Sequence, residues 1–252
     1  MTPDAKVVEG TARLVESYGS SSRQKGEWWV PPGRTSRGAL VVLVHGGYWR
    51  DTYDLSLEDA VAADLAGHGY LVWNIDYAPS SDPWPSTLAD AADAYDFAFR
   101  GHYQDLVDPE RVAVVGHSAG GQLALWLASR STLPAGAPGK RDHVVPALAV
   151  PQAPVASFES AIRLGLGGGA VDALLQGAEH LPLADPLSLA PSGVRTVIVH
   201  GTDDDIVPIS QSEDYVAASP STQLVRVPGG HFEHLDPSTE AVAQLRKALA
   251  TL

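Results

Sequence analysis

The chain has 252 residues, a length that suits one large domain or two small ones and is ample for a sizeable hydrophobic core. Its apolar fraction of 44% is that of a globular protein and excludes disorder as the main state. The net charge of −13, from 17 Lys and Arg against 30 Asp and Glu, repels phosphate backbones and anionic membranes, so we expect neither nucleic acid nor a membrane as a partner.

The cysteine count excludes several kinds of chemistry, and the N-terminal sequence indicates the cellular compartment. The chain has no cysteine, which excludes disulfides, thiolate nucleophiles and cysteine-held zinc. Residues 1–6 show no apolar segment after a basic start, and no apolar run approaches the roughly 20 residues of a membrane span. We therefore expect a cytoplasmic protein.

The first elements in chain order follow an N-terminal extension, residues 1–26, which ends in a polar loop. A β-branched run at 39–44 predicts a strand that leads into His-Gly-Gly. Apolar residues at four-residue spacing predict a helix over 57–67, and a second strand is expected at 70–75. An apolar face of Leu, Ala, Tyr and Phe predicts a further helix over 88–100.

The middle of the chain continues the alternation. A strand at 111–115 leads through a glycine-rich turn into a helix at 122–129, and two more strands are expected within 144–156 and at 194–199. The segment between these last two strands exceeds the roughly dozen residues that a crossover helix needs. We expect residues 157–193 to form a short helical insertion near the pocket, too small to be a separate lid domain.

The chain closes with a strand at 223–227 and a helix over 238–252, with Ser238 as its N-cap. Strands and helices alternate throughout, which predicts one α/β domain, 1–252, with a mostly parallel sheet and helices on both of its faces. In such sheets the chemistry lies at the carboxyl ends of the strands.

The strongest chemical signal is Gly-His-Ser-Ala-Gly at 116–120, between a strand and a helix. A serine on such a sharp turn has strained dihedral angles, and its neighbours two residues away on either side must be small. The turn lifts the Ser118 hydroxyl clear of the sheet and directs the Ala119 N–H toward whatever the hydroxyl attacks. Ser118 is therefore the expected nucleophile; the alternative is an idle serine in a tight turn.

A serine nucleophile needs a base, and nine histidines compete for this role. His231 follows the last expected strand and a glycine-rich loop, so its imidazole can reach over the sheet to Ser118. We expect it to be the base, with His234 as the main rival. His117, inside the turn, is expected to point away from the hydroxyl.

The base needs an orienting carboxylate, and three adjacent aspartates, Asp203, Asp204 and Asp205, follow the strand at 194–199. Residue type alone leaves the choice among them open. The order Ser, Asp, His along the chain is that of α/β-hydrolases.

An oxyanion hole requires backbone donors beside the nucleophile. Gly46 and Gly47 follow the strand at 39–44, and the Gly47 N–H with that of Ala119 would make a two-donor hole, worth ~10²–10³ in rate for each donor. The alternative is a Gly-Gly turn that serves only to reverse the chain.

Four side chains are candidates for the substrate pocket. Tyr48 and Trp49, beside the expected oxyanion loop, would line an acyl or aryl pocket, unless they pack under the loop. Trp84, between two prolines, would lie at the edge of the cleft. Arg50 would pair with a substrate carboxylate; the alternative is an exposed arginine without a specific role.

From residue 27 to 252 the chain resembles the α/β-hydrolase superfamily. His-Gly-Gly-Tyr-Trp at 45–49 resembles a segment of the arylformamidase (kynurenine formamidase) branch. Residues 201–208 are similar to the superfamily pattern Gly-x-x-Asp-x-x-Val-Pro, which implies Asp204 as the triad acid. The segment Gly-His-Phe at His231 is similar to the one that carries the base. The resemblance implies hydrolysis of carboxylic esters or amides without a cofactor.

We therefore expect a serine hydrolase that cleaves an ester of a small molecule, with arylformamidase activity on N-formylkynurenine as the alternative. A metal hydrolase with His231, His234 and Asp236 as ligands leaves the Gly-His-Ser-Ala-Gly segment unexplained, so we expect no metal. A non-catalytic binding protein on this fold would usually lack a member of the triad. A homodimer is compatible with the sequence.

Overall fold

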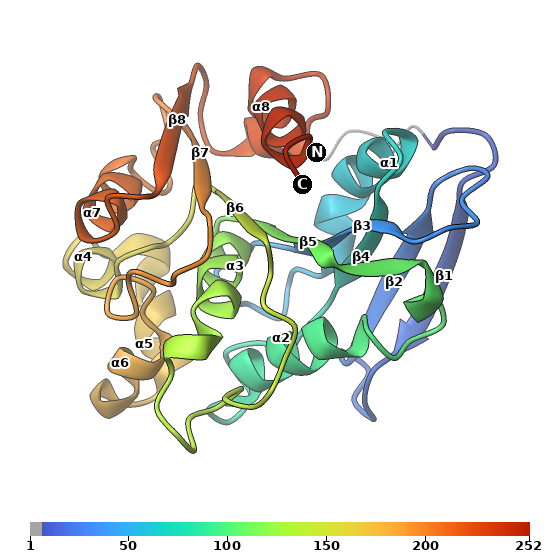
Figure 1. The fold of residues 1–252 in the computed structure, drawn as a ribbon. Helices are drawn as coiled ribbons and strands as arrows, with labels where there is room; N and C mark the ends of the chain where they lie inside the picture. Colours follow the sequence, from blue (N-terminus) through green and yellow to red (C-terminus); the bar gives the residue numbers. More distant parts are fainter. Residues whose placement is uncertain (1–6) are drawn as a thin grey trace.

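The computed structural model, which describes residues 7–252, contains one eight-stranded sheet (Figure 1). From edge to edge its strands run in the order β1, β2, β4, β3, β5, β6, β7, β8. β2 is antiparallel to β1 and to β4, and the remaining neighbours are parallel. The strands are β1 (Ala12–Ser17), β2 (Lys25–Val30), β3 (Gly38–Val44), β4 (Leu71–Ile75), β5 (Val107–His117), β6 (Leu148–Gln152), β7 (Val197–Gly201) and β8 (Gln223–Val227).

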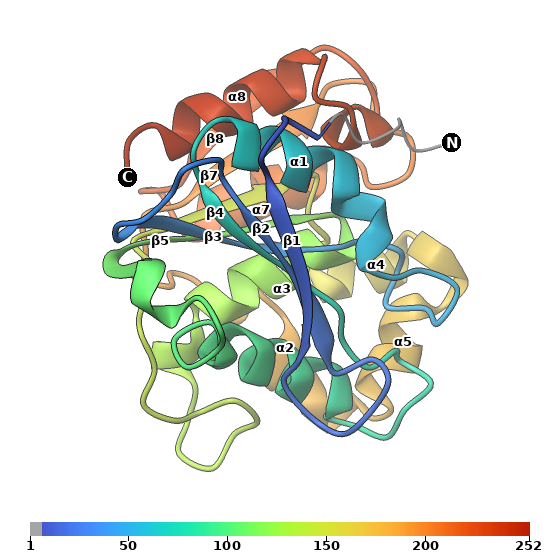
Figure 2. The same ribbon diagram turned by 90° about the vertical axis from the view of Figure 1, so that its right-hand side faces the viewer.

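Helices cover both faces of the sheet, as the sequence predicts. α1 (Asp59–Gly67) and α8 (Glu240–Leu249) lie on one face, and α2 (Ser86–Phe97) and α3 (Ala119–Ala128) lie on the other (Figure 2). β3 shows why: Leu40 and Val42 pack into the core beneath α2 and α3, whereas Val41 packs into the core beneath α1 and α8. A strand buried on both faces must be apolar at every position.

The remaining helices belong to the crossovers late in the chain. Between β6 and β7, residues 157–193 form short helices, and a further helix lies between β7 and β8. These helices are α4 (Phe158–Arg163), α5 (Ala170–Leu175), α6 (Leu181–Ala184) and α7 (Ser210–Ala218). Short 3₁₀ segments lie at Leu55–Glu58, Gln104–Leu106, Arg130–Thr132, Leu166–Gly168, Ala178–His180 and Phe232–Leu235. No helix within residues 7–252 is long and apolar enough to cross a membrane.

Two sequence-based expectations need correction. Residues 12–17, assigned to an N-terminal extension, form β1 at the edge of the sheet. This strand pairs with β2 on one side, and most of its side chains are exposed, so it lacks the apolar run that marks the inner strands. The N-cap of α8 is Thr239 and not Ser238: the Thr239 hydroxyl accepts the Val242 N–H at 3.4 Å. The Ser238 hydroxyl instead donates to Asp236 at 2.8 Å.

Candidate active site

Ser118 lies on the sharp turn between β5 and α3, with φ 59° and ψ −117°. A non-glycine residue in such a conformation is strained, and such strain is concentrated at functional sites. The flanking glycines are sterically required. A Cβ on Gly116 would lie 2.2 Å from the carbonyl oxygen of Gly120, and a Cβ on Gly120 would lie 2.1 Å from that of Val44. We refer to residues 116–120 as the serine turn.

His231 and Asp204 form a buried pair next to this turn. His231 Nδ1 lies 2.7 Å from a carboxylate oxygen of Asp204, and both residues are buried. The backbone N–H groups of Ile206 and Val207 donate to the other carboxylate oxygen at 2.9 and 2.8 Å. Asp204 is thus held by donors on both of its oxygens.

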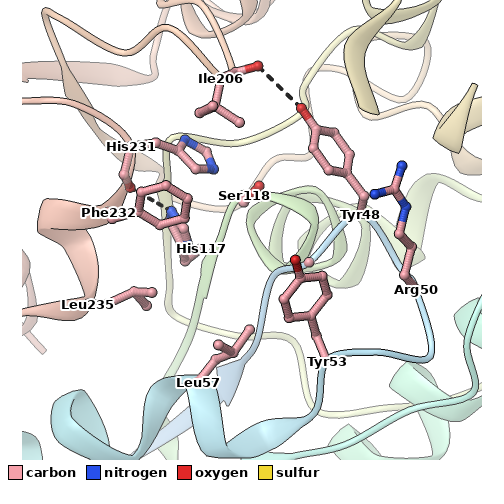
Figure 3. A pocket seen from close by; sticks show the side chains of 11 residues that line it. Tyr48, Arg50, Tyr53, Leu57, His117, Ser118, Ile206, His231, Phe232 and Leu235 are labelled. Carbon is pink, nitrogen blue, oxygen red and sulfur yellow. Dashed lines mark hydrogen bonds between the residues drawn. The ribbon is translucent and has the colours of Figure 1, made fainter. Parts of the chain in front are cut away.

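The ionisation state of Asp204 fixes the histidine tautomer. Burial raises its pKa, but hydrogen bonds from His200 and His231 and from the Val207 N–H outweigh burial and hold the pKa well below its ordinary value. An ionised carboxylate only accepts hydrogen bonds, so Nδ1 of His231 carries the proton. Nε2 is then the basic nitrogen, on the side of the ring that faces Ser118 (Figure 3).

The structure distinguishes the three adjacent aspartates. Asp204 is the one paired with His231, as the resemblance implies. Asp203 accepts the Gly229 N–H at 3.4 Å, and Asp205 is exposed.

His117, whose side chain is expected to point away from the Ser118 hydroxyl, also takes part in the site. It lines the same cavity as Ser118, and its Nε2 donates to the backbone carbonyl of His231 at 2.8 Å (Figure 3). Burial, reinforced by the neighbouring His231 and His234, holds the His117 pKa well below its ordinary value, so the ring is neutral. This bond joins the serine turn to the loop of His231. It spans 114 residues of sequence, and no local pattern indicates it.

His234, the rival base, lies outside the cavity lining. It is fully buried, its Nδ1 faces the Gln152 amide nitrogen at 3.3 Å, and burial lowers its pKa to about 3. Asp236 accepts from Ser238. Within residues 7–252, no group of three or more His, Asp or Glu side chains converges as metal ligands would, and the alternative set of His231, His234 and Asp236 is not assembled.

The loop after β3 lies directly against the serine turn. A Cβ on Gly46 would be 2.8 Å from the His117 carbonyl oxygen and 3.0 Å from the Cβ of Ser118, so only glycine allows this approach. Gly47 lines the cavity with φ +109°. Ala119 is the first residue of α3, so its N–H has no partner within the helix.

A cavity of about 470 Å³ opens beside Ser118 (Figure 3). His117, His231 and Gly47 line it together with Ser118. The other walls combine three aromatic, three aliphatic and one basic side chain: Tyr48, Tyr53, Phe232, Leu57, Ile206, Leu235 and Arg50. The Tyr48 hydroxyl donates to the carbonyl of Ile206 at 3.2 Å, which joins the loop after β3 to the loop of Asp204.

Of the four candidate pocket residues, Tyr48 and Arg50 line the cavity. Trp49 does not line the cavity and instead follows the alternative, packing under the loop. Its ring is buried, its indole N–H donates to the Gln122 side chain at 3.1 Å, and it contacts Phe158 edge-on. Trp84 is not among the residues that line the cavity, and its ring stacks on His180 with centroids 4.4 Å apart. Five further lining residues were not predicted from the sequence: Tyr53, Leu57, Ile206, Leu235 and Phe232, which adjoins the predicted base.

Comparisons with known proteins agree with this fold. The BD-FAE family profile matches residues 27–135. An uncharacterized protein of Mycobacterium tuberculosis is 28% identical over 238 residues, which cover 93% of this chain and 76% of its relative.

Solved structures resemble nearly the whole chain. Esterase B from Lactobacillus rhamnosis is 21% identical with a TM-score of 0.83, covering 98% of this chain and 87% of its own. A truncated carbohydrate esterase from gut microbiota is 18% identical with a TM-score of 0.80, covering 97% and 98%. With the strand order above, these similarities confirm the predicted α/β-hydrolase fold.

Proposed function

We propose that this protein is a serine hydrolase that cleaves a carboxylic ester of a small molecule without a cofactor. The observation that carries the proposal is that Ser118, on its strained turn, lines one cavity with His231, which is paired with the buried Asp204. A serine hydroxyl becomes a nucleophile when an adjacent base accepts its proton, and the free Nε2 of His231 is suited to that role.

In the proposed reaction, Ser118 Oγ attacks the ester carbonyl carbon while Nε2 of His231 takes its proton. Asp204 keeps Nδ1 protonated and stabilises the imidazolium that forms. The carbonyl oxygen becomes an oxyanion, which accepts hydrogen bonds from the backbone N–H groups of Gly47 and Ala119. These donors are fixed before the substrate binds, so they need no reorganisation as the charge develops.

Collapse of the tetrahedral intermediate breaks the ester bond. The alcohol leaves with the proton that His231 returns, and the acyl group stays on Ser118. Water then repeats both steps: its oxygen attacks the acyl carbon while His231 accepts its proton. The bond between the acyl carbon and Ser118 Oγ then breaks, His231 returns the proton to Oγ, and the acid is released.

Two observations bear on the substrate class. The names of the similar structures, esterase B and a carbohydrate esterase, favour an ester. The resemblance of residues 45–49 to the arylformamidase segment makes an aryl formamide, such as N-formylkynurenine, the second candidate. Tyr48 supports an aryl group in the cavity, whereas Trp49 packs in the core and contributes nothing to that choice.

The test is to compare kcat/KM for p-nitrophenyl butyrate and N-formyl-L-kynurenine with the wild type, Ser118→Ala and Ser129→Ala. Ser129 is a matched control, because it is a buried serine at the far end of α3 whose hydroxyl donates to the Leu125 carbonyl. We expect the butyrate to be preferred, its turnover to be lost in Ser118→Ala, and EDTA to have no effect.

Other outcomes are equally informative. A preference for the formamide by orders of magnitude would replace the esterase by an arylformamidase. A folded wild type that cleaves neither compound would indicate a binding protein on this fold. Full activity in Ser118→Ala would refute the assigned nucleophile.

A further inference from the structure

Arg50 is the one permanently charged side chain among the described residues that line the cavity. The other walls are aromatic, aliphatic or histidine, and burial keeps the phenol of Tyr48 neutral by raising its pKa. We propose that Arg50 selects substrates that carry a carboxylate or a similar anionic group, so that the preferred substrates are anionic esters. This proposal rests on the ester hydrolysis proposed above.

Arg50 lies at the cavity wall and has a backbone partner there. Its Nη2 donates to the backbone carbonyl of Gly167, and its guanidinium lies 5.7 Å from the ring centroid of Tyr48 (Figure 3). Gly167 has φ +62°, and a Cβ there would lie 2.6 Å from the Tyr48 ring. The segment 157–193 therefore packs closely against Tyr48 and holds Arg50 beside it.

Arg50 differs from the arginines of the protein that are paired with a carboxylate. Arg13, Arg130 and Arg246 each hold a carboxylate oxygen within 2.7 to 2.9 Å. Within residues 7–252, the guanidinium of Arg50 has no carboxylate within 4.0 Å. A guanidinium offers five N–H donors, and one backbone carbonyl leaves most of them available to a ligand.

The protein as a whole carries a strongly negative charge. With a net charge of −13, the protein repels anions at most of its surface. A guanidinium without a carboxylate partner at the cavity wall supplies a local positive charge that attracts an anion. Guanidinium also matches the planar geometry of a carboxylate, with two parallel hydrogen bonds.

The experiment compares two matched pairs of esters. In the first pair the charge is on the acyl side: p-nitrophenyl hemisuccinate against p-nitrophenyl pentanoate. In the second it is on the alcohol side: meta-butyryloxybenzoate against meta-butyryloxybenzamide. The readout is the ratio of kcat/KM for the anionic ester to that for its neutral partner, measured in the wild type, Arg50→Gln and Arg163→Gln.

Arg163→Gln is the matched control. Arg163 is an exposed arginine of α4 that bonds to Ser160, lies outside the cavity lining and carries the same charge. We expect the wild type to prefer the anionic member of at least one pair, and Arg50→Gln to lower that ratio by about tenfold, as the loss of a charged hydrogen bond does. The ratio should persist in Arg163→Gln. The responding pair identifies the side of the ester that faces Arg50.

Three results would overturn the proposal: ratios of one or less for both pairs in the wild type, an unchanged ratio in Arg50→Gln, or an equal fall in Arg163→Gln. In each of these cases the neutral esters are still cleaved, so the hydrolase assignment survives. A wild type that cleaves none of the four esters would refute the proposed function, and the role of Arg50 with it.

Discussion

The hydrogen bond between His117 and the carbonyl of His231 leads to the most specific prediction. His117→Met removes the donor while keeping a side chain of similar length, and it leaves a buried carbonyl without a partner, which costs about 1–3 kcal/mol. The loop of His231 is then free to shift relative to the serine turn. Because a displacement of about 1 Å can reduce a catalysed rate ~10²-fold, we expect kcat to fall by ~10- to 100-fold with KM little changed.

His117→Gln is the matched variant, since its Nε2–H can occupy the position of the imidazole Nε2–H. We expect this variant to keep kcat within about threefold of the wild type, because the buried hydrogen bond is retained. The assay is steady-state hydrolysis of p-nitrophenyl butyrate, with urea unfolding to confirm that each variant is folded. Wild-type kcat in the Met variant, or equal impairment of both variants, would refute this reasoning.

Three further changes test the site and its support. Asp204→Asn should lower kcat ~10⁴-fold through the wrong histidine tautomer, whereas Asp203→Asn should retain activity; equal activities would refute the assigned acid. Gly120→Ala should destabilise the protein by about 1–3 kcal/mol in urea unfolding, because its Cβ meets the Val44 carbonyl; wild-type stability would contradict the geometry. Burial raises the pKa of Glu58 to about 8, so its neutral form contributes stability that is lost as pH rises from about 4.5 to about 8. From about pH 5 to about pH 8, Glu58→Gln should therefore gain up to about 4 kcal/mol over the wild type; a pH-independent difference would contradict this.

Local sterics made the fold and the serine turn predictable. Continuous apolar runs such as Leu40–Val44 predict strands that are covered on both faces, and the structure has them so. The glycines two residues before and after Ser118 predict a tight turn, and in the structure a Cβ on Gly116 or Gly120 would meet backbone. The pairing of Asp204 with His231 could be inferred only with the help of the family resemblance. Three neighbouring aspartates share the same local pattern, and only the tertiary structure separates them.

Features that depend on contacts distant in sequence were not predictable. Tyr48 and Trp49 are adjacent aromatic residues with φ angles of 52° and 55°, yet one faces the cavity and the other the core. The hydroxyl of Tyr48 reaches Ile206, and the indole of Trp49 reaches Gln122; neither partner is visible from the sequence. The edge strand β1 escaped prediction because it packs on one neighbour and most of its side chains face solvent.

The most direct test of the central claim is covalent labelling with a fluorophosphonate probe, followed by mass spectrometry of the modified peptide. We expect the wild type to be labelled at Ser118, Ser118→Ala to remain unlabelled, and His231→Asn to react at least ~10²-fold more slowly, since the base contributes about that factor or more. Labelling at another residue, or a folded wild type that does not react, would contradict the proposed serine hydrolase.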